Sequence, residues 1–173
     1  KTIFELLPEF KDLNTVGRMD KDSEGLILLS NDGTITNAVT SDKHIIEKEY
    51  EVGVREDATP FKLRKMAQGI LLEDGMTLPA KTRSLGQHKF IIILKEGRKH
   101  QIRRMASAMQ LTTISLKRIR IGNINLGNLK SGKHRLLTQE EISKLKQKSP
   151  WYLYLIFFYR LPAFLRAFRA LSQ

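Results

Sequence analysis

Residues 16–33 read VGRMDKDSEGLILLSNDG and join an acidic loop to an apolar segment. The loop contains three acids, Asp20, Asp22 and Glu24. The segment 26–30 predicts a buried strand, and the turn residues Asn31-Asp32-Gly33 end it. A carboxylate held against a wall of Leu and Ile could act as a nucleophile or a base. Composition alone instead favours a polar turn before a strand, so both interpretations stay open at this point.

On either side of this stretch, short strand-like and helix-like runs alternate without repeats or low-complexity linkers. The predicted strands are 26–30, 48–54, 77–84, 89–94 and 113–121, and the predicted helices are 34–41, 59–68, 98–109 and a last one from Thr138. Thr138 and Glu141 have the spacing of a capping box. The irregular order predicts an α+β domain with a mixed, mainly antiparallel sheet flanked by helices.

The charge of the chain is divided between its two parts. The 173 residues carry a formal net charge of +12 and contain no cysteine, which excludes a disulfide framework and a thiol nucleophile. Residues 1–80 have a net charge of −5 and residues 81–173 have +17. Such a basic part favours a polyanionic partner, either nucleic acid or an acidic membrane surface.

Two further segments contain candidate functional residues. Residues 95–105, KEGRKHQIRRM, predict a basic helix on which Arg103 and Arg104 point about 100° apart, so one can face a buried acid and the other RNA. Tyr50 lies on the apolar face of a predicted strand, where a core role and stacking on a base are equally plausible. The histidines lack metal-ligand spacing and no nucleotide-binding glycine pattern occurs, so neither a metal nor a cofactor is assigned.

Four segments, in this order, resemble the motifs of the ribosomal pseudouridine synthases of the RsuA/RluB/RluE/RluF family. They are GRMDKDSEGLILLSNDG at 17–33, EKEY at 47–50, EGRKHQIRRM at 96–105 and KRIRIGNINLGNLKSGKHRLLTQEEI at 117–142. The resemblance covers about residues 2–147. It implies a pseudouridine-synthase-like α+β fold with an RNA-binding cleft. It also implies an isomerase that converts uridine to pseudouridine in ribosomal RNA without a cofactor.

The resemblance also assigns roles to individual residues. Asp20 is implied as the catalytic aspartate, Tyr50 as the ring that packs against the target base, and Arg103 as the partner that pairs with Asp20 and keeps it ionised. Arg18 is implied to occupy the space left by the flipped-out uridine, because the base must leave its stack to react. The expected RNA contacts are Arg18, Lys21, Arg98, Lys99, His100, Gln101, Arg104, Lys117, Arg118 and Arg120.

We expect residues 1–148 to form the catalytic domain, without the family's first strand or an S4-like RNA-binding domain. Residues 149–173 form an aromatic and basic tail that could pack on the domain or a partner, lie on a membrane surface, or be non-native. No signal-peptide pattern is present, so a cytoplasmic location is expected. A monomer is also expected. Two other functions stay open: a non-catalytic RNA-binding or ribosome-assembly module, and a peripheral membrane protein anchored by the tail.

Overall fold

The computed structural model describes residues 3–41 and 46–146. The tail 149–173 lies outside the described residues, so the alternatives for it stay predictions. The helical elements are α1 (Ile3–Leu6), the 3₁₀ turn η1 (Pro8–Phe10), α2 (Gly33–Thr40), α3 (Pro60–Gln68), α4 (Gln101–Ala108) and α5 (Gln139–Lys146). The strands are β1 (Asn14–Thr15), β2 (Glu24–Gly25), β3 (Leu29–Ser30), β4 (Lys48–Val54), β5 (Leu71–Leu72), β6 (Gly75–Met76), β7 (Lys81–Gly86), β8 (Lys89–Leu94), β9 (Thr113–Ile121) and β10 (Ile124–Asn125).

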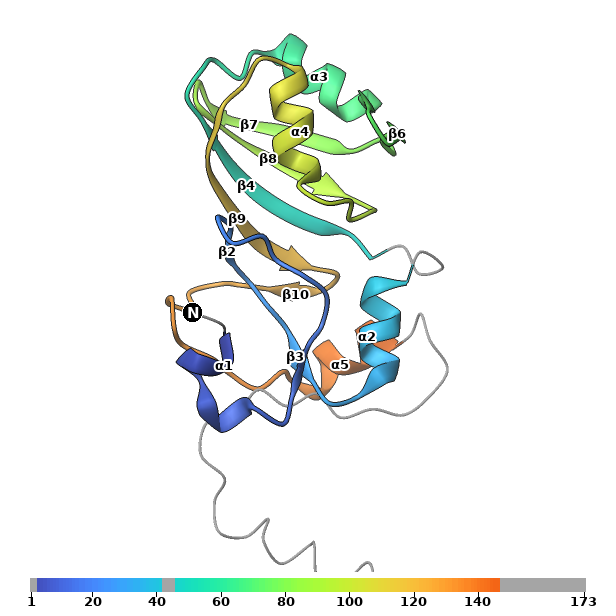
Figure 1. Cartoon of the computed structure of the whole chain (residues 1–173), viewed down its shortest axis with the longest axis vertical. Helices are drawn as coiled ribbons and strands as arrows, with labels where there is room; N and C mark the ends of the chain where they lie inside the picture. Colours follow the sequence, from blue (N-terminus) through green and yellow to red (C-terminus); the bar gives the residue numbers. More distant parts are fainter. Residues whose placement is uncertain (1–2, 42–45, 147–173) are drawn as a thin grey trace, which may run out of the picture.

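The main sheet has the strand order β10-β9-β4-β8-β7, and β2 joins it by pairing with β9. The β2–β9 pairing is parallel, whereas the other four pairings of this sheet are antiparallel. The long strands β4 and β9 run from the part of the molecule that carries α3 and α4 to the part that carries α1, α2 and α5 (Figure 1). The predicted α+β class with a mixed, mainly antiparallel sheet is confirmed.

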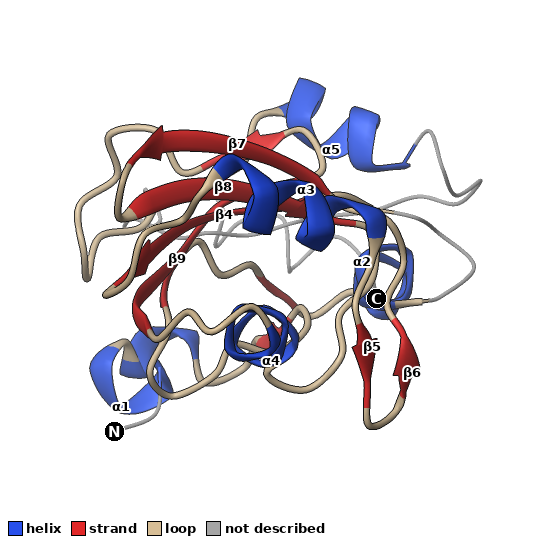
Figure 2. Cartoon of the chain, turned by 90° about the horizontal axis from the view of Figure 1, so that it is seen from above, coloured by secondary structure: helices blue, strands red, loops and turns tan. Residues whose placement is uncertain are grey.

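Each of these two parts has its own large apolar core, and a smaller cluster of Phe10, Leu13 and Leu29 packs the N-terminal segment. The upper core packs α3 and α4 on one face of the sheet (Figure 2) and includes the fully buried Val52, Met66, Phe90, Ile92 and Met105. The lower core joins α2, α5, β10 and the end of β9 through Leu28, Ile35, Ile121, Ile124 and Ile142. Each large apolar side chain buried in this way contributes about 1.5–3 kcal/mol to folding.

Local capping explains where several helices begin. Asp32 accepts a hydrogen bond from Thr34 N at 2.8 Å and starts α2, and Thr59 accepts one from Lys62 N at 3.4 Å and starts α3. At α5, Thr138 Oγ1 accepts from Glu141 N at 3.1 Å while Glu141 accepts from Thr138 N at 2.8 Å. The predicted capping box is therefore confirmed.

Three predicted elements differ from the structure. The strand 26–30 is reduced to β3, because β2 and β3 pair with different strands, β9 and β1. The strand 77–84 begins at Lys81, and the two-residue strands β5 and β6 before it were not predicted. The helix 98–109 begins at Gln101, so Lys99 and His100 lie in the preceding loop and not on the helix.

Within residues 3–41 and 46–146, no helix has the length and apolar character needed to cross a membrane.

Candidate active site

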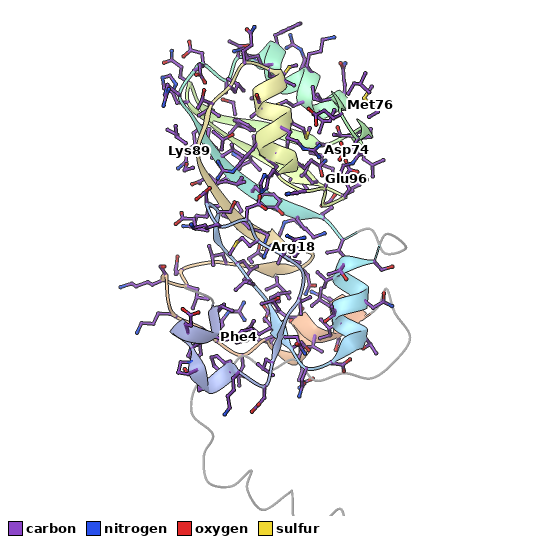
Figure 3. The ribbon with its side chains drawn as sticks, viewed as in Figure 1. Phe4, Arg18, Asp74, Met76, Lys89 and Glu96 are labelled. Atoms are coloured by element: carbon purple, nitrogen blue, oxygen red, sulfur yellow. The ribbon has the colours of Figure 1, made fainter. Side chains whose placement is uncertain are left out.

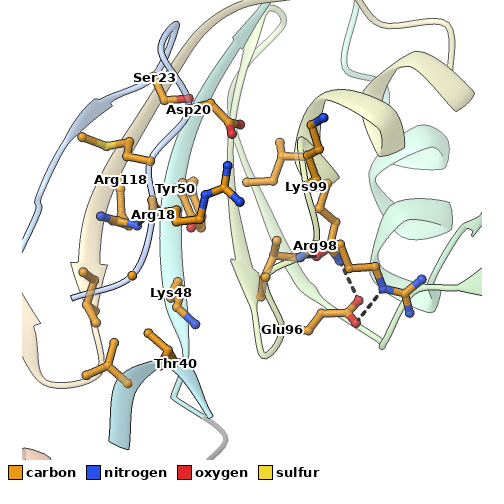
Figure 4. Close-up of a pocket in the computed structure, with 18 of the residues that line it drawn as sticks. Arg18, Asp20, Ser23, Thr40, Lys48, Tyr50, Glu96, Arg98, Lys99 and Arg118 are labelled. Atoms are coloured by element: carbon orange, nitrogen blue, oxygen red, sulfur yellow. Dashed lines mark hydrogen bonds and ion pairs between the residues drawn. The ribbon is translucent and has the colours of Figure 1, made fainter. Parts of the chain in front are cut away.

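A pocket of about 300 Å³ opens where the two cores meet. Val39 and Ile121 of the lower core line it, and so do Ile102 and Leu116 of the upper core. Figure 4 shows how the loop before β2, strand β4 and the segment before α4 surround the same space. Asp20 and Tyr50 both line this pocket, so the structure brings together two of the three residues expected to be catalytic.

The pocket is strongly basic at its rim and walls. Its charged lining residues are the six cations Arg18, Lys48, Lys95, Arg98, Lys99 and Arg118 and the two anions Asp20 and Glu96. A cavity with this excess of positive charge attracts polyanions and raises their local concentration. Its volume lies at the small end of the range for small-molecule sites, about 300–1,000 Å³, and so suits one nucleoside rather than a larger ligand.

The loop that carries Asp20 is fixed by arginines that bind its backbone. Arg118 Nε donates to Leu26 O at 2.7 Å and Arg118 Nη1 donates to Arg18 O at 3.1 Å. Arg103 Nη2 donates to Asp22 O at 2.6 Å. Within the loop, Ser23 N donates to Asp20 O at 3.0 Å. Guanidinium groups suit this task because their donors are fixed in one plane and stay charged.

The partner of the Asp20 carboxylate differs from the expected one. Asp20 Oδ1 lies 3.5 Å from His100 Nε2, and no ion pair joins Asp20 to Arg103 among the residues that the structure describes. Arg103 instead donates to the carbonyl oxygens of Asp22 and Thr113. The expected Arg103–Asp20 pair is therefore corrected. The guanidinium of Arg103 is engaged by those two carbonyls, and His100, at the N-cap position of α4, is the residue that reaches the carboxylate.

Tyr50 is half-buried on β4 and packs against the upper core. In Figure 4 its side chain overlaps that of Arg18 in projection, and both residues line the pocket together with Asp20. One part of the ring is thus supported by apolar side chains while Tyr50 also lines the pocket. An aromatic ring in this position can stack against a planar base.

A network centred on Glu96 holds the segment before α4. Glu96 Oε1 accepts hydrogen bonds from Leu78 N at 2.8 Å and Gln101 Nε2 at 2.6 Å, and Glu96 Oε2 accepts one from Arg98 Nε at 3.0 Å. Arg98 Nη1 also donates to Gly75 O at 3.1 Å, which ties the β5–β6 hairpin to this segment. Figure 3 shows Glu96 close to the labelled hairpin residues Asp74 and Met76. Sequence reasoning missed this role, although Glu96 is the only acid between Lys95 and Arg135.

The residues expected to contact RNA fall into two groups. Arg18, Lys21, Lys99 and His100 are exposed, and Lys117 is half-buried on β9. Arg98, Gln101, Arg104, Arg118 and Arg120 are engaged by other parts of the protein. RNA contact by either group stays a prediction.

Two of the engaged arginines shift the pKa of their acidic partners. The hydrogen bond from Arg104 lowers the pKa of Asp74, and those from Lys81 and then Arg120 lower the pKa of Glu47. The positive charge of Arg104 and Arg120 is thus partly neutralised within the protein. The exposed cations that line the pocket, in contrast, are Arg18, Lys95 and Lys99.

A family model described as RNA pseudouridylate synthase matches residues 5–108. The chain belongs to this family. The matched region contains the Asp20 loop, Tyr50 and the segment before α4, which together form most of the pocket.

Individual relatives agree with this assignment. The chain is 36% identical over 150 residues to the ribosomal small subunit pseudouridine synthase A of Vibrio cholerae, covering 84% of this chain and 65% of the relative. It is 38% identical over 137 residues to the ribosomal large subunit pseudouridine synthase B of Bacillus subtilis, covering 76% of this chain and 56% of the relative. The crystal structure of a pseudouridylate synthase superposes with a TM-score of 0.79 at 38% identity, covering 83% of this chain and 65% of that one. The chain thus spans about two thirds or less of the length of these family members.

Proposed function

We propose that this chain is the catalytic part of a ribosomal RNA pseudouridine synthase. The observation that carries the proposal is that Asp20 and Tyr50 line one nucleoside-sized pocket with a basic surround. The named relatives supply the substrate class, since they act on ribosomal RNA of the small or the large subunit. Because both kinds of relative are similarly close, the proposal names ribosomal RNA and neither subunit. A protein that modifies ribosomal RNA is expected to act in the cytoplasm.

The reaction would move one bond and conserve every atom. The bond between the sugar C1′ and the base N1 breaks, the uracil rotates, and a new bond joins C1′ to C5. The proton that leaves C5 is balanced by one that N1 gains. No oxidant, reductant or energy source is needed for such an isomerisation, and Asp20 would supply the carboxylate that starts cleavage of the glycosidic bond.

The pocket residues would hold the flipped-out nucleotide during this exchange. Extruding a base from folded RNA costs a few kcal/mol, which the protein must offset with new contacts. Tyr50 would stack on the extruded uracil, and Arg18 would fill the space that it leaves. The exposed cations at the pocket would bind neighbouring phosphates, which makes the affinity dependent on salt.

Replacement of the carboxylate tests the proposal. Small-subunit and large-subunit ribosomal RNA, transcribed in vitro with uridine tritiated at C5, serve as substrates, and tritium release measures the reaction. We expect Asp20→Asn to abolish release while RNA binding stays within about twofold of the starting affinity, because one neutralised carboxylate removes a single charge. The matched control is Glu24→Gln, which removes an exposed carboxylate from β2, directly after the Asp20 loop, at a residue that does not line the pocket.

Two outcomes would contradict the proposal. An Asp20→Asn variant that isomerises uridine at the rate of the unchanged protein would remove Asp20 from the mechanism. Salt-sensitive RNA binding by the unchanged chain without tritium release from either RNA would favour the non-catalytic RNA-binding module.

A further inference from the structure

Arg118 is a buried arginine without an acidic partner. Its exposure is 4%, and it forms no ion pair with any residue in the described ranges 3–41 and 46–146. Its Nη2 atom is buried and has no hydrogen-bond partner there. A buried guanidinium is costly to desolvate, and apolar residues of similar volume usually stabilise a core at least as well. Core stability by itself therefore gives little physical reason for an arginine at this position.

The side chain of Arg118 closes the loop that carries Asp20. Its two hydrogen bonds reach Arg18 O, two residues before Asp20, and Leu26 O, where the loop ends. The backbone of Arg118 adds a third bond, because Arg118 O accepts from Leu26 N at 2.8 Å. Figure 4 shows Arg118 behind Arg18, on the side of that loop segment facing away from α4.

The close approach of β2 to β9 occurs at Arg118 as well. Gly25 pairs with Arg118 in the parallel register, and a Cβ atom at Gly25 would overlap the carbonyl oxygen of Arg118. Gly25 also has a φ of +106°, which side-chain-bearing residues rarely adopt. Glycine is therefore required where the backbone at the end of the loop packs against the backbone of Arg118.

We propose that Arg118 is the positioning residue of the active-site loop, and that it acts on Asp20 through the carbonyl oxygens of Arg18 and Leu26. The expected RNA contact of Arg118 is the alternative that the experiment below separates from this role. The inference rests on the proposed function for the meaning of Asp20, but the clamp itself is a property of the fold. The two side-chain hydrogen bonds and the one backbone hydrogen bond of Arg118 set the position of the Asp20 carboxylate. Misplacing a reacting group by about 1 Å can lower the rate by about 10²-fold.

Arg118→Lys in the full chain tests the clamp. Lysine keeps the charge but has a single donor group, so it cannot reach both carbonyls in the arginine's geometry. We expect tritium release to show a kcat lowered by about 10²-fold with KM within about threefold, and hydrogen exchange of the amides of residues 19–25 to accelerate at least about tenfold. Arg118→Met is the second variant, since it keeps an unbranched side chain that suits a buried site and removes the donors to both carbonyl oxygens.

Arg135→Lys is the matched control. Arg135 also binds a backbone carbonyl, Leu136 O at 3.0 Å, but pairs with Glu141 outside the pocket. We expect it to change neither kcat nor exchange of the loop amides. A rise in KM above about tenfold with kcat unchanged would make Arg118 an RNA contact and overturn the inference. Unchanged loop exchange in both Arg118 variants would also overturn it.

The exchange measurement separates this inference from the proposed function. If the unchanged chain releases no tritium, the proposed function fails, and the comparison of loop exchange still decides whether Arg118 holds the loop. If the unchanged chain is active and the Arg118→Lys variant is equally active with a faster-exchanging loop, only the positioning role fails.

Discussion

His100 Nε2 lies 3.5 Å from Asp20 Oδ1, and the backbone of His100 is in the left-handed region with φ 51°. Only one other non-glycine residue in the described part of the chain has a positive φ, Gln110. His100 occupies the N-cap position of α4, but its side chain makes no capping hydrogen bond there. The strained conformation thus directs the imidazole to the Asp20 carboxylate and not to the helix end.

Replacement of His100 by asparagine tests the value of this contact. Asparagine tolerates the left-handed conformation, so His100→Asn should fold with little change in melting temperature. The contact between the imidazole and the Asp20 carboxylate is partly exposed, and such contacts contribute at most about 1 kcal/mol, so we expect kcat for tritium release to fall by no more than about fivefold. Gln110→Asn, at the other left-handed position, controls for the backbone. A His100→Asn variant with unaltered kcat would show that this pair does not orient Asp20.

The ring of Tyr50 is expected to carry base recognition. Base–aromatic stacking contributes about 1–3 kcal/mol per base, so Tyr50→Leu should lower kcat/KM by about 5- to 150-fold. Tyr50→Phe keeps the ring and should leave KM within about twofold. Steady-state tritium release from the same ribosomal RNA measures both. If Tyr50→Leu had the same kcat/KM as the unchanged protein, stacking by Tyr50 would be excluded.

Any residue larger than glycine at position 25 should destabilise the fold. A Cβ atom there would lie 2.7 Å from Arg118 N and would need the positive φ as well. We expect Gly25→Ala to destabilise the protein by at least about 2 kcal/mol, measured by urea denaturation. The control is Gly33→Ala, where no atom lies within 4 Å of the added carbon. Equal stabilities of the two variants would contradict the close β2–β9 contact.

Glu141 should stabilise the protein only while it is ionised. Hydrogen bonds from Arg135, followed by those from Thr138, lower the pKa of Glu141 below its ordinary value of 4.5. Its contribution is therefore complete above about pH 4.5 and is lost as the pH falls through the lowered pKa of the folded state. We expect Glu141→Gln to cost about 1 kcal/mol at pH 7 and almost nothing at a pH well below that lowered value.

Urea denaturation of Glu141→Gln and the unchanged protein at a series of pH values measures this difference. Glu140→Gln is the control on the same helix turn, because Glu140 pairs only with the exposed Lys144 in the described part of the chain. A stability difference that persists undiminished in acid would mean that the carboxylate charge plays no part.

Several elements were predictable because their signals are local. The bounds of β4, β8 and β9 match the prediction, since the alternation of apolar and charged residues in β4 and the continuous apolar run in β8 can be recognised without knowledge of their partners. The Thr59 cap of α3 and the Thr138–Glu141 capping box are equally local. The β5–β6 hairpin escaped prediction because two-residue strands have no measurable period, and Arg98 and Arg104 hold it from outside.

The sequence by itself determined the α+β class, the family motifs and the candidate pair Asp20 and Tyr50, which the structure places on one pocket. Only the tertiary structure decided that His100 faces Asp20, that Arg103 and Arg118 bind loop carbonyls, and that Glu96 ties the hairpin to the loop before α4. The physical reason is that periodicity and caps depend on neighbours along the chain. The partner of a guanidinium or carboxylate depends on which acceptor or donor lies across space, and residues far apart in the chain supply it, as Arg118 does for the carbonyl oxygens of Arg18 and Leu26.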